Sequence, residues 1–69
     1  MKPLSGREVC SILLRHGFHN VRQKGSHVIM QKIVSDSTIT VPVPMHKKLR
    51  EGTLRSIIRQ SGLAKRDFE

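Results

Sequence analysis

Six consecutive residues, Arg22-Gln23-Lys24-Gly25-Ser26-His27, place an imidazole beside two cations, a hydroxyl group and a glycine. RNA carries its own nucleophile, the 2′-hydroxyl, so a metal-free nuclease has to remove that proton and stabilise the charge that develops on the phosphate. An imidazole is well suited to proton transfer near neutral pH. Lys24 and Arg22 can stabilise the developing negative charge. His27 is therefore a candidate general base or acid.

The two residues before His27 fit the same chemistry. Gly25 lets the backbone approach a phosphate closely, and Ser26 can donate a hydrogen bond to a phosphate oxygen or orient the imidazole. Lys-Gly-Ser is also a common hairpin turn, in which His27 would only be a polar residue at the start of a strand. Judged by residue chemistry alone, the plain hairpin is slightly favoured.

The other three histidines carry weaker signals. His46 lies in a basic loop, where it either contacts phosphate, acts as a second acid or base, or is simply solvated, which we favour. His16 falls in the last turn of an expected helix, where a cation suits the helix dipole, and His19 has no distinguishing context. No two histidines have the i, i+4 spacing of a helical metal site and Cys10 has no partner cysteine, so we expect no metal.

The charge of the chain favours a polyanionic partner. Thirteen Lys and Arg against five Asp and Glu give a formal charge of +8. Such an excess usually marks a surface that binds nucleic acid, because each contacted phosphate releases counterions. Lys47 and Lys48 lie in the basic loop, and Arg55 and Arg59 share one face of an expected helix. The alternatives are a solvated face, an acidic protein partner or, less favoured, anionic lipid.

Several functional classes lack their sequence features. The chain has no Tyr or Trp and two Phe, which argues against an aromatic platform for stacked bases. Five scattered carboxylates do not provide a two-metal site, and no phosphate-binding glycine motif or other cofactor signature is present. There is no apolar run of about 18 residues and no signal sequence. With one free cysteine, these features favour a cytoplasmic protein without a cofactor.

Local patterns predict five elements. Ser5 and Glu8 form a capping box that starts the first helix, and Pro42 should lie at a sheet edge or beyond the end of the ladder. The expected elements are a helix over residues 6–16, strands over 18–24, 27–34 and 38–43, a basic loop over 44–50, and a helix that opens at Gly52-Thr53 and stops at Gly62. After it, Phe68 should pack back on the body.

The 69 residues are enough for one domain, residues 1–69. Each expected helix carries one apolar stripe, and a three-stranded antiparallel sheet can bury one face against both. The sequence therefore predicts an α+β two-layer sandwich with the element order α-β-β-β-α and both helices on one face. Double-stranded-RNA-binding domains have this order, although fold alone does not establish function.

Three segments in order resemble one known family: Gly25-Ser26-His27, then Thr40-Val41-Pro42-Val43-Pro44, then the segment 52–63, GTLRSIIRQSGL. Together they resemble the HicA family, and the similarity runs from Ser5 to about Phe68. Each segment alone is a weak signal, whereas the ordered combination is specific.

The resemblance implies a toxin of a toxin–antitoxin pair with a double-stranded-RNA-binding-like fold. It also implies cleavage of messenger RNA and neutralisation by a HicB-like antitoxin. The histidine of the family's Gly-Ser-His motif corresponds to His27, which would be catalytic. Met45 stands where a polar loop residue is expected, and this departure affects only the RNA contacts of the loop.

The sequence leads to one main hypothesis and two alternatives. The main hypothesis is a metal-independent endoribonuclease in which Lys24 and Ser26 assist His27 and the basic loops hold RNA. The first alternative is a non-catalytic RNA- or DNA-binding module that uses the same basic face, and the second is an interaction protein whose positive surface meets an acidic partner.

Overall fold

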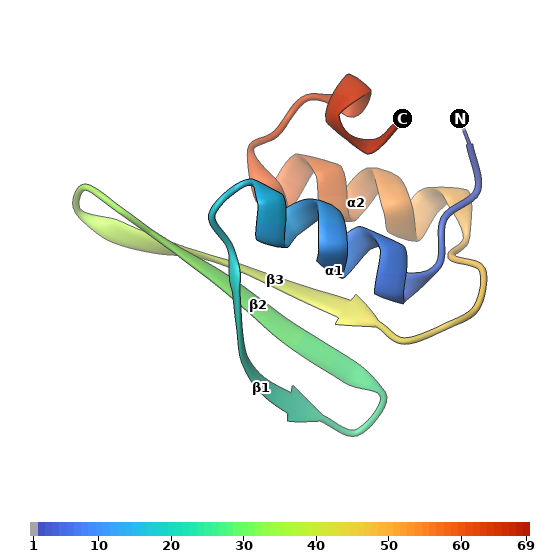
Figure 1. The fold of residues 1–69 in the computed structure, drawn as a ribbon, viewed down its shortest axis with the longest axis horizontal. Coiled ribbons are helices and arrows are strands. Elements are labelled where there is room, and N and C mark those ends of the chain that lie inside the picture. The colour runs from blue at the N-terminus through green and yellow to red at the C-terminus, as the bar shows by residue number, and fades with distance from the viewer. Residues whose placement is uncertain (1) are drawn as a thin grey trace.

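The computed structural model describes residues 2–69, and Figure 1 shows two helices packed over one face of an antiparallel sheet. The sheet has the strand order β1-β2-β3. The elements are α1 (Gly6–Arg15), β1 (His19–Lys24), β2 (His27–Val34), β3 (Ser37–Pro44), α2 (Glu51–Ser61) and a short 3-10 helix, η1 (Lys65–Phe68). The predicted α+β class and the order α-β-β-β-α are confirmed.

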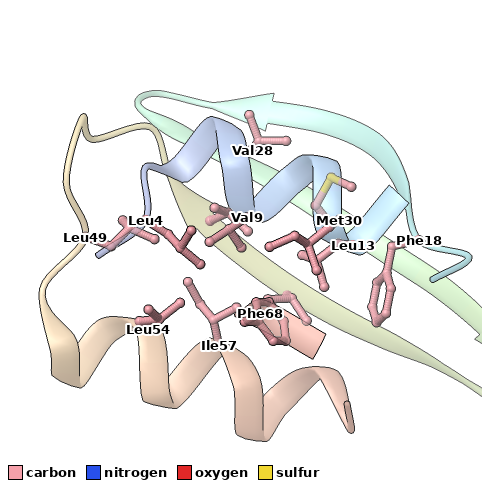
Figure 2. Packing of buried hydrophobic residues seen from close by; sticks show 13 residues of the cluster. Leu4, Val9, Leu13, Phe18, Val28, Met30, Leu49, Leu54, Ile57 and Phe68 are labelled. Atoms are coloured by element: carbon pink, nitrogen blue, oxygen red, sulfur yellow. The ribbon is translucent and has the colours of Figure 1, made fainter. Parts of the chain in front are cut away.

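The hydrophobic core fills the space between the sheet and the helices. Leu13 from α1, Met30 from β2 and Leu54 from α2 are almost completely buried there, and Figure 2 shows their side chains converging between the elements. Phe18 and Phe68 are the two largest buried side chains. Phe68 returns from η1 to pack on the core, as the sequence predicted, so the C-terminal turn closes the layer of helices.

The capping box at the start of α1 is formed as predicted. The backbone amide of Glu8 donates to the Ser5 hydroxyl (3.0 Å), and the backbone amide of Ser5 donates to the Glu8 carboxylate (2.9 Å). At the other end, His16 is the C-cap, and its Nδ1 lies 2.9 Å from the carbonyl oxygen of Ile12. Since a carbonyl oxygen only accepts, Nδ1 is the donor of this hydrogen bond, and His16 lies at the end of α1 where the sequence placed it.

Strand register divides the sheet into two faces. Val28 pairs with Val43 and Met30 with Val41, and all four side chains are buried beneath the helices on the inner face. Neighbouring residues in a strand point to opposite sides. The outer face therefore carries the partners in between: His27 with Pro44, Ile29 with Pro42, and Gln31 with Thr40.

The two sheet edges differ from each other. β3 is an edge strand, and Pro42 lies in it opposite Ile29, so the first of the two expectations for this proline is correct. β1 forms the other edge and carries a bulge between Asn20 and Arg22, which leaves Val21 without a partner. A missing amide and a bulge both hinder the addition of a further strand at an edge.

Five predicted boundaries shift by one or two residues, beginning with β1, which starts at His19 instead of residue 18, and β3, which starts at Ser37 instead of residue 38. β3 continues to Pro44, which was placed in the loop, because Pro44 still pairs with His27. α2 begins at Glu51, with Arg50 as its N-cap, instead of at Gly52-Thr53. α1 ends at Arg15. No helix within residues 2–69 is both long enough and apolar enough to span a membrane.

Candidate functional site

His27 is the first residue of β2 and its side chain is exposed. A two-residue turn, Gly25-Ser26, separates it from its register partner Lys24. On its other side His27 pairs with Pro44 at the end of β3. The imidazole therefore lies at one end of the sheet, in the central strand, and is exposed to solvent.

A shallow groove joins His27 to α2. From the sheet it is lined by His27, Pro42 and Pro44, and from the helix by Gly52, Thr53, Ser56, Ile57 and Gln60. The helical residues are spaced i, i+3, i+4 and i+7 from Thr53, so they form one stripe. This stripe places hydroxyl and amide groups opposite the imidazole, and the groove has no carboxylate in its lining.

The first turn of α2 contributes to the lining of the groove. Gly52 and Thr53 belong to this turn, and the N-cap residue Arg50 makes no side-chain cap hydrogen bond. The first amides of a helix have no partner within the helix and carry the positive end of its dipole. The groove thus combines an imidazole with a helix end that favours negative charge, a pairing suited to a phosphate group.

The predicted supporting residues of the hairpin lie on the same face as His27. Lys24 is the register partner of His27, and Arg22 is the partner of Ile29, so both side chains project from the outer face. Neither lines the groove. Gly25 has φ +60 and Ser26 is exposed in the turn. The structure therefore groups Arg22 and Lys24 with His27 on one face, beside the groove rather than inside it.

The other predicted cations are distributed over separate surfaces. Lys47 lines a hollow on the inner side of the hairpin, and Lys48 lines another hollow near the N-terminus with Glu51. Neither residue lines the groove at His27. If both bind RNA, as we predicted, they contact it outside that groove.

Arg55 and Arg59 are both exposed on the side of α2 away from the core, as predicted. Their surroundings differ. The Arg55 guanidinium lies 3.2 Å from the Glu51 carboxylate, one turn earlier. Arg59 follows Ser56 by three residues, so it is a surface neighbour of the stripe that lines the groove.

The remaining histidines and the cysteine lie outside the groove. His19 is exposed at the start of β1, and His46 is exposed in the loop after β3. Cys10 is partly buried beside the core, and desolvation raises the pKa of its thiol. Within residues 2–69, no three His, Cys, Asp or Glu side chains are grouped closely enough to hold a metal ion.

Sequence reasoning missed the polar part of the groove. Thr53, Ser56 and Gln60 were not singled out, although their i, i+3, i+7 spacing on an amphipathic helix was visible. They look like ordinary solvent-facing residues until β3 and the hairpin turn are placed beside them.

The fold and the site together define a class: a small basic α+β domain of order α-β-β-β-α with an exposed histidine at a hairpin turn facing its second helix. The sequence model of the family described as "HicA toxin of bacterial toxin-antitoxin" matches residues 6–63. The chain therefore belongs to the HicA toxin family, and the predicted resemblance is confirmed. No curated protein sequence matches the chain.

Proposed function

We propose that this protein is the toxin of a toxin–antitoxin pair and acts as a metal-independent endoribonuclease on messenger RNA. The observation that carries the proposal is His27, exposed in a groove that also contains the uncapped first turn of α2. Membership of the HicA family supports the toxin role. A messenger RNA substrate places its action in the cytoplasm.

In the proposed reaction His27 removes the proton from a ribose 2′-hydroxyl. The 2′-oxygen attacks the adjacent phosphorus, and the bond from phosphorus to the 5′-oxygen breaks. The products are a 2′,3′-cyclic phosphate and a 5′-hydroxyl, which takes up a proton. Lys24 and the first amides of α2 stabilise the negative charge on the phosphate as it develops, while Ser26 donates to a phosphate oxygen or orients the ring.

Binding of the rest of the RNA is assigned to the surrounding cations. Arg22 extends the positive outer face beyond Lys24, and Arg59 borders the groove from α2. Lys47, Lys48 and Arg55 contact the strand outside the groove. With a formal charge of +8, we expect affinity to fall steeply as the salt concentration rises.

Family membership implies a toxin–antitoxin pairing. We propose a HicB-like antitoxin that covers the His27 groove, since a single protein seated there blocks both the imidazole and the phosphate-binding end of α2. Protection of His27 from a histidine-modifying reagent in the purified pair, but not in the free toxin, is the expected sign. Full reactivity of His27 within the pair would exclude this mode of inhibition.

The decisive experiment compares wild type, His27→Ala and His19→Ala. His19 is a matched control because it is also an exposed histidine, located outside the groove. We expect His27→Ala to lose cleavage of a defined RNA and growth inhibition, while its circular dichroism spectrum and RNA affinity stay close to those of wild type. His19→Ala should behave as wild type in all four measurements.

Two results would reject the nuclease proposal. One is RNA cleavage by His27→Ala at the wild-type rate. The other is a purified wild-type protein, free of its partner, that neither cuts RNA nor slows growth. If RNA binding persists in the second case, the chain is the non-catalytic RNA-binding module that the sequence left open.

A further inference from the structure

A second hollow lies at the same end of the sheet as His27 but on its inner side. Three segments supply its polar lining: Arg7 comes from the first turn of α1, Gln23 from β1, and His46 and Lys47 from the loop between β3 and α2. Its volume of about 540 Å³ is ample for a phosphate group and its ribose neighbours.

Backbone hydrogen bonds hold these three segments together. The amide of Gly6 donates to the carbonyl oxygen of His46 (2.9 Å), which joins the start of α1 to the loop. The amide of Met45 donates to the carbonyl oxygen of Ser26 (2.8 Å), which joins the loop to the hairpin turn. These two hydrogen bonds therefore fix the relative positions of the segments whose side chains line the hollow.

The charged side chains that line the hollow are all positive. Arg7 and Lys47 both line it, and no carboxylate does. Two other hollows with cations in their lining contain acids as well: Glu51 in one, and Glu8 with Glu69 in the other. Two cations without a counter-charge repel each other, and an anion bound between them relieves that repulsion.

Register relates this hollow to the proposed cleavage site. Gln23 and Val28 are partners that face inward and line the hollow, while Lys24 and His27 are the next partners and face outward. The two sites therefore lie on opposite sides of the hairpin turn, one residue apart along each strand. A strand of RNA that bends around Gly25-Ser26 passes from one site to the other.

We propose that the hollow binds a backbone phosphate of the RNA strand that is cut at His27, with Arg7 and Lys47 as the phosphate ligands. The strand then wraps around the hairpin turn, which holds the scissile phosphate against the imidazole. That the bound strand is cut at His27 rests on the proposed function. The phosphate contact in the hollow can be tested by RNA binding alone, without cleavage.

The test uses His27→Ala protein, so that the RNA probe stays intact, and a fluorescein-labelled single-stranded RNA oligonucleotide whose anisotropy is measured across a series of KCl concentrations. Adding Arg7→Ala/Lys47→Ala should reduce the slope of log affinity against log salt by about 1.4, since each single-strand phosphate contact contributes about 0.7. Raising the salt from about 50 to about 200 mM weakens RNA binding in both proteins. The factor of weakening should be about sevenfold smaller in this variant than in the parent.

Lys65→Ala/Arg66→Ala provides the matched control. It removes the same charge from exposed residues of η1, which lies across the helices from the hairpin turn (Figure 1). We expect this control to change the slope by less than half as much. The exchange Arg7→Lys/Lys47→Arg, which keeps both charges, should retain the parent slope.

An equal effect of the two double-alanine variants would overturn the proposal, because net charge alone would then explain the binding. An unchanged slope in Arg7→Ala/Lys47→Ala would overturn it as well. The nuclease proposal is tested by a different measurement, the cleavage assay, in which it fails if His27→Ala still cuts RNA. The two proposals can therefore fail independently of each other. Thermal unfolding of every variant checks that the fold is kept.

Discussion

The backbone amide of Met45 donates a hydrogen bond of 2.8 Å to the carbonyl oxygen of Ser26. This bond extends the β2–β3 pairing by one residue beyond Pro44 and fixes the turn directly before His27. Position 45 therefore contributes through its backbone, and its side chain packs against the core. The departure from a polar residue at this position is explained by packing.

The turn itself gives the first prediction. Gly25 has φ +60, whereas Ser26 does not have a positive φ, a combination that fits a two-residue hairpin with glycine in its first position. A Cβ at Gly25 would have open space around it, so the cost of Gly25→Ala is conformational. We expect a loss of about 1–2 kcal/mol in the free energy of unfolding. Ser26→Ala should cost much less in the same urea titration, and equal losses would refute the assignment.

Periodicity and capping were sufficient to predict the elements. The Ser5–Glu8 box, the apolar stripes and the turn residues predicted both α-helices and all three strands to within one or two residues, because each of these signals is local. The core members Phe18 and Phe68 were also expected from the sequence.

The composition of the site was harder to predict, because it depends on contacts between distant segments. His27 was identified through a motif of adjacent residues. The groove requires α2 to pass beside β3, and the hollow of Arg7 and Lys47 requires the start of α1 to meet the loop after β3. No local pattern reports such pairings, so Gln60 and Arg7 emerged only from the three-dimensional arrangement.

The start of α1 carries the second prediction. A Cβ built at Gly6 would lie 2.0 Å from the carbonyl oxygen of Pro44, a backbone atom that cannot move aside alone. Gly6→Ala should therefore destabilise the fold by about 1–3 kcal/mol, the usual cost of overpacking. Gly52→Ala is the control, because its Cβ meets nothing within 4 Å. It should be neutral or stabilising by up to about 1 kcal/mol. The reverse order of stability would contradict this packing.

The capping box makes stability depend on pH. The backbone hydrogen bond from Ser5, followed by its side-chain hydrogen bond, lowers the pKa of the Glu8 carboxyl. The pKa of Glu8 is therefore lower in the folded protein than in the unfolded chain. The ionised carboxylate stabilises the fold at pH values above the unfolded-state pKa, and this stabilisation is lost as the pH falls through the folded-state pKa. Thermal unfolding from neutral to acidic pH should show a smaller acid-induced loss for Glu8→Gln than for wild type. Identical pH profiles would argue against the box in solution.

Cys10 yields a prediction about reactivity. Desolvation raises the pKa of its thiol, so less thiolate is present at mildly alkaline pH than in the unfolded chain. Alkylation by iodoacetamide should be slower in the folded protein than in denaturant. The neutral thiol stabilises the fold below its unfolded pKa, and this contribution is lost as the pH rises through the folded value. Equal alkylation rates in both states would show that the thiol is not shielded.

The two arginines of α2 should differ in their contribution to RNA binding. Arg59 neighbours the groove stripe, whereas Arg55 is paired with Glu51 at 3.2 Å, and this pair has no net charge. Arg59→Ala should lower the slope of log affinity against log salt by about 0.7, the value for one single-strand phosphate contact. Arg55→Ala should lower it by less.

Glu51→Gln provides the internal check on this difference, because it releases the Arg55 charge without moving the arginine. The variant should bind the same labelled RNA more tightly than the parent and show a steeper salt slope. All three variants belong in the His27→Ala background, so that the RNA stays uncut during the measurement. A loss from Arg55→Ala as large as that from Arg59→Ala would mean that the RNA contacts the whole exposed side of α2, not only the edge that faces His27.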